Sequence, residues 1–565
     1  MKGLSIVLLA LFLASCQKPS RLPPELPEPL PPSTVASMAE SLYGALTLGK
    51  PLPSLPSDDL KERYFLLRLG DGINPPCRFQ VKGKGSDQAL KNLLDATQEC
   101  EHRIRWLRLD AVRGIATIDD SDVQLERGMA GIASDTAPPK FWLPLEVPNS
   151  VLSTAGELKQ EKLRALDPDC QRWVRFGTHS VFVDEEGVYT LFRGHRQDLP
   201  EREPEQMLAA ARQGGDYLLR ALGPDGRFNY LYYPIWGKSS NEYNMLRHAG
   251  STYSLLQLYR ETKVPKYLDG AKRAVDYLLY SVQNSAKTPD GKVLVSEDSV
   301  KLGGNALTVV ALCEYVELSG DRTPLAEAAD LAEWMVKNQT KKGRFNVHKE
   351  SFPEGDPSGF ISGYYPGEAL LALTRLYALD HDERWLNAAK KSAHFLVQKA
   401  RKENEPAHDH WLLIGLEALY RFDPDPAYPD YAFYLSKRIL ATQLGSRQRP
   451  DWEGGFYIPP RSTPTDIRVE GLNAAWSLAA KRGNREMAEL LKAGVLKGLK
   501  FSALCEIRPE AAVLMEQPGY CKGGVMRALA SPEIRIDYVQ HHISALLGAR
   551  KLLLQQDGLT GISRK

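Results

Sequence analysis

The sequence predicts a mainly α-helical protein, in which a large helical domain follows a small α/β domain and a Pro-rich segment. Helical periodicity runs from about residue 203 to the C-terminus, two kinds of helix alternate there, and Gly-containing turn motifs recur between them. A chain of 565 residues is long enough for two or three domains. The net charge of +2 does not point to nucleic acid or to an acidic surface as a partner.

The first residues are typical of a secretory signal. Lys2 precedes an apolar run over residues 4–13, which is too short to span a membrane. The run ends in Leu13-Ala14-Ser15-Cys16, which resembles the lipobox of bacterial lipoproteins. This resemblance implies that residues 1–15 are a signal peptide and that Cys16 is diacylated, which anchors the chain to a membrane. The alternative is an ordinary signal peptide with an incidental cysteine.

Residues 16–56 are predicted to form a tether between the lipid and the globular part. They are Pro-rich, with Leu22-Pro23-Pro24-Glu25-Leu26-Pro27 and Pro31-Pro32, and such segments are extended and semi-rigid. A short helix can occupy residues 33–48. Gln17, rather than Asp, follows the lipidated cysteine, and in enteric-type bacteria this favours the outer membrane, with the protein facing the periplasm.

A small α/β domain is expected over residues 57–200. The segment contains no phosphate-binding Gly loop and no nucleophile elbow, so its simplest interpretation is a structural or substrate-gating module. Its apolar runs alternate with turn residues in the manner of short strands. The pattern predicts strands at 64–69 and 105–109, a helix at 89–97, extended segments at 141–145 and 173–176, and a hairpin over 180–192.

Six cysteines remain for an oxidising compartment once Cys16 carries lipid. Two pairs are candidate disulfides: Cys77 with Cys100, which flank a predicted helix, and Cys505 with Cys521, which flank a loop. No Cys-x-x-Cys motif and no Cys-His pair with zinc spacing occurs, so no metal site and no cofactor are expected.

The large helical domain is expected over residues 203–556. Long helices with one charged face, which we call outer helices, alternate with six shorter segments rich in small and aliphatic residues, which we call inner helices. The outer helices are predicted at residues 205–221, 266–282, 324–338, 384–399, 428–444 and 485–500. The inner helices are predicted to begin near Arg247, Gly303, Tyr364, His408, Arg468 and Arg535.

The connecting loops repeat as well. Gly226-Arg227-Phe228-Asn229 follows the first outer helix and Gly343-Arg344-Phe345-Asn346 follows the third, while Gly454-Gly455-Phe456 and Gly523-Gly524-Val525 follow the fifth and sixth. The segment Ile467-Arg468-Val469-Glu470 also matches Ile534-Arg535-Ile536-Asp537. These matches indicate one repeated helical hairpin.

Six hairpins can form an open solenoid or a closed ring, and the sequence favours closure. An open solenoid needs polar terminal repeats, but here the first and last inner helices are as apolar as the others, over residues 249–258 and 543–553. The arrangement resembles the six-hairpin (α/α)6 toroids, a superfamily of glycoside hydrolases, polysaccharide lyases and sugar epimerases. The resemblance implies that loops entering the inner helices meet at one end of the ring, and that an active site lies there.

Two carboxylates at this end suit acid–base chemistry. Glu470 and Asp537 stand at equivalent positions in neighbouring hairpins, each two residues after an arginine. Adjacent helices lie about 10 Å apart, so the two carboxyl groups can approach the separation that glycosidases use. In the alternative, structural interpretation each carboxylate caps its own helix and pairs with the nearby arginine.

Histidines provide a second candidate chemistry. His248 and His541 lie on the first and last inner helices, which ring closure makes neighbours. Two imidazoles, or an imidazole with a tyrosine, can remove and return a proton at a sugar carbon. In the structural interpretation one histidine of the His541-His542 pair bonds a backbone carbonyl in the core.

The remaining polar and aromatic side chains at the helix starts suit a ligand rich in hydroxyl groups, and three arginines favour an acidic sugar. The residues expected to bind substrate are Arg247, Tyr243, Tyr364, Glu368, His410, Trp411, Arg468 and Arg535.

The sequence thus predicts a cell-envelope carbohydrate-active enzyme, similar to glycoside hydrolases, that acts on an oligo- or polysaccharide. A sugar epimerase or lyase on the same fold is the first alternative. A non-enzymatic lipoprotein that binds glycan or assists assembly is the second. The convergence of acids and histidines at the helix starts favours an enzyme over a binding protein.

Overall fold

The computed structural model describes residues 29–55, 61–118, 130–151, 159–403, 407–447 and 449–561. The predicted signal peptide and Cys16 lie outside these residues. The chain divides into two compact units, one made of residues 1–67, 79–98 and 109–181, the other of residues 68–78, 99–108 and 182–565. Within the described residues, none of the helices combines the length and apolarity of a membrane span.

The predicted tether contains a helix. α1 spans Pro32–Leu48, with proline in its first turn, and ends at Gly49 in the left-handed conformation. It packs against α2, Gly85–Ala96, and the short helix expected over residues 33–48 is confirmed. The reason is the spacing of its apolar residues, which form one buried stripe. The side chains of that stripe are Val35, Met38, Ala39 and Leu42.

A mixed segment built around one seven-stranded sheet confirms the small α/β domain. The strand order is β2-β1-β3-β6-β4-β5, with β7 paired to β6, and β1 is buried along almost its whole length. The helical elements of this part besides α1 and α2 are η1 (Thr97–Glu99), η2 (Asn149–Val151) and α3 (Gln160–Leu166). The strands are β1 (Glu62–Gly70), β2 (Cys77–Lys84), β3 (Trp106–Thr117), β4 (Gly131–Ser134), β5 (Lys140–Trp142), β6 (Trp173–Val183) and β7 (Val188–Leu191).

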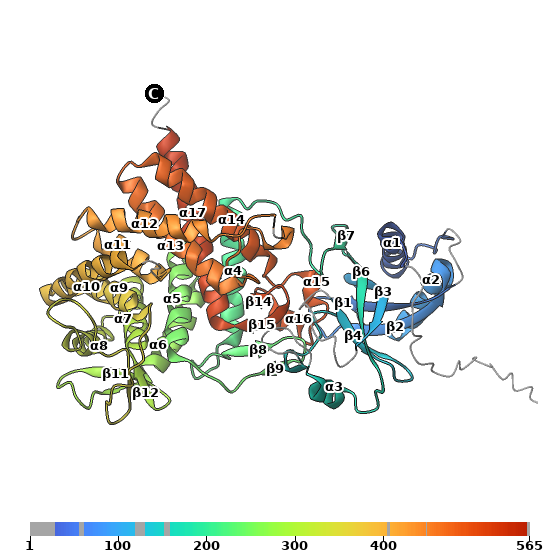
Figure 1. Cartoon of the computed structure of the whole chain (residues 1–565), viewed down its shortest axis with the longest axis horizontal. Helices are drawn as coiled ribbons and strands as arrows, with labels where there is room; N and C mark the ends of the chain where they lie inside the picture. Colours follow the sequence, from blue (N-terminus) through green and yellow to red (C-terminus); the bar gives the residue numbers. More distant parts are fainter. Residues whose placement is uncertain are drawn as a thin grey trace, which may run out of the picture. The chain divides into compact units, whose positions relative to one another are not determined.

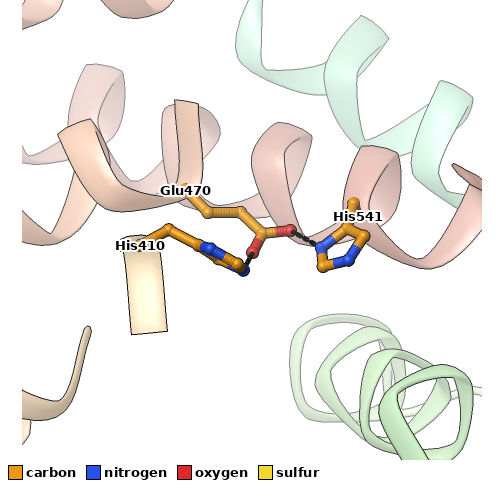
Figure 2. A group of neighbouring side chains, drawn as sticks. All are labelled: His410, Glu470 and His541. Carbon is orange, nitrogen blue, oxygen red and sulfur yellow. Dashed lines mark hydrogen bonds and ion pairs between the residues drawn. The ribbon is translucent and has the colours of Figure 1, made fainter. Parts of the chain in front are cut away.

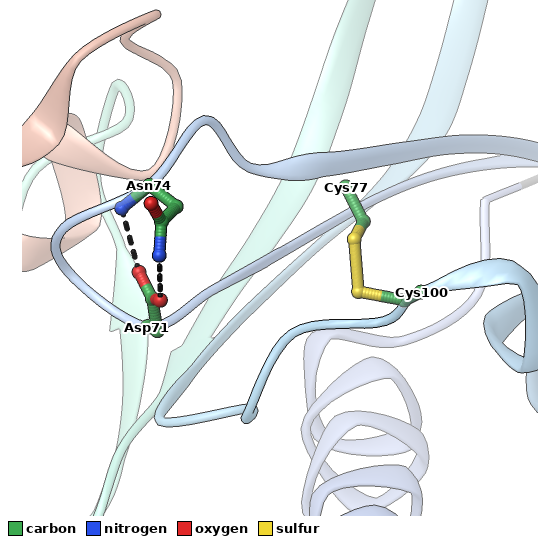
Figure 3. The surroundings of a disulfide bond; sticks show 4 residues. All are labelled: Asp71, Asn74, Cys77 and Cys100. Carbon is green, nitrogen blue, oxygen red and sulfur yellow. Dashed lines mark hydrogen bonds between the residues drawn. A yellow bond between two sulfur atoms is a disulfide. The ribbon is translucent and has the colours of Figure 1, made fainter.

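One of the two expected disulfides is present. Cys77, the first residue of β2, is bonded to Cys100, just beyond η1 (Figure 3). In the turn before β2, the Asp71 carboxylate accepts hydrogen bonds from the backbone and side chain of Asn74. The prediction for Cys505 and Cys521 is wrong, because both are buried free thiols. Closeness in sequence does not fix the distance between two side chains.

The second unit contains the alternating helices. The outer helices are α4 (Pro204–Ala221), α6 (Pro265–Tyr280), α8 (Leu325–Lys337), α10 (Glu383–Lys402), α12 (Ala427–Ala441) and α14 (Arg485–Leu504). The inner helices are α5 (Met245–Thr262), α7 (Leu302–Ser319), α9 (Tyr365–Asp380), α11 (His410–Leu419), α13 (Ser462–Lys481) and α17 (Ile536–Gly561). Both ends of each predicted outer helix are confirmed to within four residues, because its one-sided apolar pattern marks its extent.

The inner helices form a closed ring (Figure 1). Each packs against the next from α5 through α7, α9, α11 and α13 to α17, and α17 returns to α5. Each outer helix packs against two consecutive inner helices, and α4 closes the outer layer by packing against both α5 and α17. The predicted (α/α)6 toroid is therefore confirmed. The sixfold alternation covers the inner helices almost all round, which explains why their buried residues lie on every face.

Polar side chains set the starts of several of these helices. Asn244 accepts a hydrogen bond from the Arg247 N–H at the start of α5, and Asp409 accepts one from the Leu412 N–H at the start of α11. Asn484 does the same for α14, and Glu203 forms a capping box with Gln206 at α4. Such caps satisfy backbone donors that a helix cannot use internally.

Short strands join the loops at the starts of the inner helices. β8 (Leu231–Tyr233) pairs with β9 (Lys238–Ser239) and with β15 (Ser531–Arg535), which also pairs with β14 (Met526–Ala528). This sheet joins the loop before α5 to the loop before α17. The other loop elements are β10 (Val282–Asn284), β11 (Lys292–Ser296), β12 (Ser299–Lys301), β13 (Lys349–Ser351), η3 (Pro450–Trp452), α15 (Pro509–Ala512) and α16 (Pro518–Cys521).

The repeated turn motif has a structural explanation. The glycine after each of four outer helices has a positive φ and lies against a backbone carbonyl of the next outer helix around the ring. A Cβ at Gly523 would stand 2.0 Å from the Gln213 oxygen of α4, so the last repeat docks on the first. The apolar residue two positions after each glycine is buried. The other three contacts join Gly226 to Arg273, Gly343 to Lys391 and Gly454 to Lys497.

Replacing Gly343 with alanine is expected to destabilise the protein by about 3 kcal/mol. A left-handed conformation costs an L-residue about 1 kcal/mol or more, and the new methyl group would stand 2.0 Å from the Lys391 carbonyl oxygen. Gly320 is the matched control: its φ of 75° is also left-handed, but nothing lies within 4 Å of an added Cβ. Urea denaturation of both variants tests this prediction. Equal losses of stability in the Gly343 and Gly320 variants would contradict the role of Gly343 in packing against the Lys391 carbonyl of α10.

Candidate active site

The first turns of the inner helices converge at one end of the ring, which we call the mouth. Arg247 in the first turn of α5 contacts Asp537 in the first turn of α17, and Tyr364 at the start of α9 lies against His410 at the start of α11. One boundary differs from the prediction, because α13 begins at Ser462 rather than near Arg468. Glu470 consequently lies deeper in the ring than the start of its helix.

Three buried side chains from three inner helices form what we call the imidazole–carboxylate cluster: His410 of α11, Glu470 of α13 and His541 of α17. Figure 2 shows the two imidazoles on opposite sides of the carboxylate. His541 Nδ1 donates to Glu470 Oε1 at 3.0 Å, and His410 Nε2 lies 3.7 Å from Glu470 Oε2. Neither ring nitrogen of His410 has a hydrogen-bond partner among the described residues.

The surroundings drive the two imidazoles toward opposite protonation states. Burial lowers the pKa of His410 well below its ordinary value, and the charges of His541 and Arg468 lower it further. Burial opposes protonation of His541 too, but Glu470 and Asp537 raise the pKa of His541 above its ordinary value. Burial raises the pKa of Glu470, and His541 opposes that rise. His410 is therefore a neutral base and His541 is the favoured proton carrier.

Arg247, Arg535 and Asp537, which we call the arginine–aspartate cluster, lie one helical turn from His541. Asp537 is 3% exposed and accepts hydrogen bonds from Arg535 at 2.5 and 3.0 Å, and Arg247 Nε lies 3.1 Å from Asp537 Oδ2. Burial alone would raise the pKa of Asp537, but the two arginines lower it. Asp537 is thus an ionised, fully paired carboxylate, as the structural interpretation expected.

Aromatic rings flank the other side of the imidazole–carboxylate cluster. The Tyr364 ring lies 6.0 Å from His410, and the Trp411 ring lies 6.3 Å from His541. Arg468, which is 5% exposed, places its guanidinium 5.0 Å from the Tyr457 ring instead of pairing with Glu470. Tyr457 is 49% exposed and has a φ of 74°. Sequence reasoning missed Tyr457, whose only signal was its place after a repeated Gly-Gly-Phe motif.

His248 does not join this site. The His248 Nε2–H donates to the Ala274 carbonyl of α6 at 2.8 Å, and Nδ1 accepts from the Tyr243 hydroxyl at 2.7 Å. The Tyr243 hydroxyl in turn accepts from the Phe228 N–H of the first turn motif. Burial lowers the pKa of His248 to about 4. These bonds tie His248 to α6 and Tyr243 to the first turn motif, while the predicted roles of both residues in catalysis and binding stay predictions.

Glu368, one of the residues expected to bind substrate, is buried. The Glu368 side chain is 2% exposed, and its Oε2 occupies the space that a Cβ on Gly303 of α7 would need. Burial, reinforced by the charge of Asp409, raises the pKa of Glu368 well above its ordinary value. Burial also raises the pKa of Asp409 to about 8. Burial thus favours the protonated form of both carboxyls, which explains how they tolerate burial.

His542 belongs to a second buried network that sequence reasoning did not anticipate. His542 Nδ1 lies 3.3 Å from Asp466 of α13, and Nε2 lies 2.8 Å from Glu506, which also pairs with Arg202 at 2.6 Å. Consecutive residues on a helix point about 100° apart, so His541 faces the mouth and His542 faces the outer layer. The expected bond from this histidine pair to a carbonyl is replaced by carboxylate partners.

The imidazole–carboxylate cluster is also the group of described residues whose ligand atoms could hold a metal ion, since those atoms all lie within 4.8 Å of one another. Two imidazoles and a carboxylate are a donor set that Zn²⁺ accepts. In the present geometry, however, His541 Nδ1 is hydrogen-bonded to Glu470. A metal ion bound through His541 Nδ1 would replace this hydrogen bond.

No protein-family model matches the chain, and no curated protein is similar to it in sequence. Solved structures do match. A D-mannose isomerase is 16% identical to this chain, and the alignment covers 62% of this chain and 97% of the isomerase, with a TM-score of 0.47. An α-1,6-mannanase from Salegentibacter sp. is 13% identical, with coverages of 61% and 99% and a TM-score of 0.46. A cellobiose 2-epimerase from Bacillus thermoamylovorans is 13% identical, with coverages of 60% and 99% and a TM-score of 0.46.

Proposed function

We propose that the protein is a carbohydrate-active enzyme that moves a proton at a sugar carbon next to a carbonyl or carboxyl group, as a sugar epimerase or isomerase does. The observation that carries this proposal is the pair His410 and His541, which share Glu470 and whose pKa values the environment drives apart. Two titratable groups in such opposed environments are suited to act as base and acid.

The reaction assigns a role to each group. The neutral His410 takes the proton from the sugar carbon, and the C–H electrons form a C=C bond while the carbonyl π electrons move to oxygen. The protonated His541 donates to the opposite face of that carbon while the electrons on oxygen return to re-form the carbonyl. This leaves His410 protonated and His541 neutral, and proton exchange of both with water restores the starting state, in which Glu470 stabilises the His541 imidazolium. His541 Nε2 has no hydrogen bond to another described residue, which leaves it for substrate.

The side chains around the pair suit a sugar. Tyr364 and Trp411 offer aromatic faces to the C–H side of a sugar ring. Arg468 and the arginine–aspartate cluster supply charged donors for hydroxyl and carboxylate oxygens. An oligo- or polysaccharide with an acidic residue therefore remains our proposal for the ligand class.

Hydrolysis by Glu470 and Asp537 is the second candidate. It is favoured by one observation: burial raises the pKa of Glu470 while the arginines lower the pKa of Asp537, the combination that a general acid and an ionised partner need. Proton transfer is the better-supported reaction, because both Asp537 oxygens are bonded to arginines.

Hydrogen exchange separates these reactions. The full-length protein is incubated in D2O with a panel of reducing sugars, uronates and their oligosaccharides, and NMR follows deuterium at each carbon. We expect deuterium at one carbon of at least one sugar, with its glycosidic bonds intact and the rate unchanged by EDTA. Release of reducing ends without exchange would establish hydrolysis instead, binding without either change would establish a binding protein, and loss of exchange in EDTA would assign the cluster to a metal.

We also propose that Cys16 carries lipid and holds the protein in the bacterial cell envelope, at the outer membrane facing the periplasm. The Leu13-Ala14-Ser15-Cys16 motif and the following Gln17 support this. Fractionation of cells that express the wild type or Cys16→Ser tests it. Recovery of both proteins in the soluble fraction would refute lipid anchoring.

A further inference from the structure

Two lysines stand side by side at the mouth, where β12 leads into α7. Lys301 is the last residue of β12 and Lys349 is the first residue of β13, and the two lie directly opposite each other in this antiparallel pair of strands. The next residue pair toward α7 is hydrogen-bonded, since the Leu302 N–H donates to the His348 carbonyl at 3.1 Å. Such pairs alternate along the strands, so the lysines form a non-hydrogen-bonded pair, the kind whose side chains approach most closely.

The two lysine side chains point away from α8 and are partly exposed. Their neighbours Val300 and Glu350 are 1% and 7% exposed, and Glu350 accepts a hydrogen bond from Trp334 Nε1 of α8 at 3.2 Å. Because successive side chains of a strand point to opposite faces, Lys301 and Lys349 lie on the other face of the sheet, where solvent reaches them. Figure 1 shows β12 at the end of the ring where β8 and β9 also lie, so this face is open to a ligand at the mouth.

Neither lysine has a counter-charge, in contrast to two other lysines of the same sheet region. Lys287 pairs with Asp356 at 2.6 Å, and Lys292 of β11 pairs with two carboxylates of α8 at 2.7 and 3.2 Å. Among the residues that the structure describes, Lys301 and Lys349 form no ion pair. Like charges directly opposite each other destabilise a sheet. The pair therefore costs folding stability that no described ion pair offsets.

The surrounding charges make this part of the mouth positive. Burial lowers the pKa of Lys301, and the charge of Lys349 lowers it further. Arg247 acts in the same direction, whereas the exposed Glu297 raises the pKa of Lys301. Arg247 belongs to the arginine–aspartate cluster, whose single carboxylate is already shared with Arg535. An anion bound at the lysine pair would therefore offset an excess of positive charge.

The lysine pair is remote from Arg468, a further cation of the mouth. Arg468 is 5% exposed and also forms no ion pair with another described residue. It lies on α13, the fifth inner helix, whereas Lys301 directly precedes α7, the second. Neighbouring helices are about 10 Å apart, so opposite members of a ring of six are about 20 Å apart. This separation favours acidic groups on two different sugar residues over two groups on one.

We infer that Lys301 and Lys349 form a second anion-binding subsite of the mouth, which holds a carboxylate or sulfate group of the substrate. Arg468 and the arginine–aspartate cluster hold one acidic group, and the lysine pair holds another. The ligand is therefore an oligosaccharide with acidic groups on at least two residues. An ammonium group is a point charge, so the pair does not select between carboxylate and sulfate. The inference rests on the carbohydrate ligand proposed above and not on the proposed reaction.

Isothermal titration calorimetry on the full-length protein in about 0.01 M salt, where charges are little screened, tests the inference. The probes are tetragalacturonate, a heparin-derived tetrasaccharide, the neutral cellotetraose and the single sugar D-glucuronate. We expect at least one acidic tetrasaccharide to bind more tightly than cellotetraose and about tenfold more tightly than D-glucuronate, because it engages two subsites. Lys301→Met and Lys349→Met should each weaken the binding of that tetrasaccharide about fivefold, the effect of losing one partly exposed charge.

Lys287→Met is the matched control. It removes the same charge from the same sheet region, but from a lysine that is already paired with Asp356, and should leave the affinity unchanged. Lys301→Met and Lys349→Met should be at least as stable in urea as the wild type, since each removes one of two like charges. Weaker binding by these two variants is then not a consequence of unfolding.

Three results would overturn the inference. The first is that no acidic tetrasaccharide binds at about 1 mM, and the second is that Lys287→Met weakens binding as much as the two test variants do. The third is a loss of stability in both test variants, which would make the lysine pair structural. Lysine-dependent binding without deuterium exchange would uphold the inference and contradict the proposed reaction. Exchange with unchanged affinity in both lysine variants would overturn the inference and leave the proposed reaction standing.

Discussion

Replacing His410 with alanine is expected to lower the turnover number about 10³-fold, as measured by deuterium incorporation into the sugar identified in the exchange assay. Removing a general base costs about 10² to 10⁴ in rate. His410 is suited to that role because it is neutral, 3% exposed, and hydrogen-bonded to no other described residue. The helical core should stay folded, because no hydrogen bond is lost.

The pH dependence of the wild-type rate follows from the directions of the two pKa changes. His410 must be neutral, and its lowered pKa keeps it so well below its ordinary value of 6.5. His541 must be protonated, and its raised pKa extends activity above 6.5. The rate should therefore fall with rising pH only above the ordinary histidine value of 6.5, as His541 loses its proton.

Glu470→Gln isolates the contribution of the shared carboxylate. Without the negative charge beside it, His541 should lose its proton at lower pH, so the alkaline limb should move downward while exchange at low pH persists. The matched control is His394→Ala, a half-exposed histidine on outer helix α10, which should leave the rate unchanged. An unaltered rate in His410→Ala, or an unmoved alkaline limb in Glu470→Gln, would refute the proposed roles.

Replacing His542 with glutamine is expected to destabilise the folded protein by about 3 kcal/mol near neutral pH. The substitution leaves two buried carboxylates, Asp466 and Glu506, without the cation between them. Breaking a buried ion pair by removing one partner costs about 3 to 5 kcal/mol. Arg202 still neutralises Glu506, which places the expected loss at the lower end.

The same network makes the stability of the wild type depend on pH. Burial opposes protonation of His542, but Asp466 and Glu506 raise the pKa of His542 from 6.5 to about 9. Its contribution to the free energy of unfolding is complete below pH 6.5 and is lost as the pH rises through 9. The difference corresponds to about 3 kcal/mol at about 1.4 kcal/mol for each pH unit.

Glu506 sets the acid limit of this stability. Burial alone would raise the pKa of Glu506, but Arg202 and His542 lower it below its ordinary value of 4.5. The contribution of Glu506 is therefore present above pH 4.5 and is lost only as the pH falls through the lowered value. The network is therefore most stabilising between pH 4.5, above which Glu506 contributes fully, and pH 6.5, below which His542 contributes fully.

Urea denaturation followed by circular dichroism at a series of pH values measures both effects. The wild type should lose stability between pH 6.5 and 9, and His542→Gln should lose far less over the same range. His394→Gln serves as the control for an exposed histidine and should follow the wild type. Parallel curves for wild type and His542→Gln would show that His542 is not the titrating group.

Several features of the fold could be predicted from the sequence because each is a local property of the chain. The one-sided apolar pattern of residues 205–221 predicted α4 to within one residue. Gly343 and Gly454 repeated at equivalent loop positions because each must adopt a left-handed turn against a carbonyl of the neighbouring helix. The largely apolar residues 543–553 indicated ring closure, since α17 is covered by neighbours on both sides.

The partners of the titratable groups could not be predicted in the same way. Glu470 and Asp537 look equivalent in sequence, yet Asp537 bonds its own Arg535 and Glu470 bonds His541. The difference arises because α13 begins at Ser462, which places Glu470 two turns into its helix, whereas Asp537 stands at the start of α17. The partners of His248, the Ala274 carbonyl of α6 and the Tyr243 hydroxyl, could not be predicted for a related reason.

The sequence by itself determined the alternation of helices, the closed toroid and the concentration of histidines and acids near the inner helices, because periodicity and composition are sufficient to specify them. Only the tertiary structure decided that His410, Glu470 and His541 share one cluster and that His542 serves stability instead. Helix rotation and depth set these partnerships, and a shift of one residue turns a side chain by about 100°. The local sequence pattern does not specify the rotation or the depth of a helix, because both depend on how all six hairpins pack around the ring.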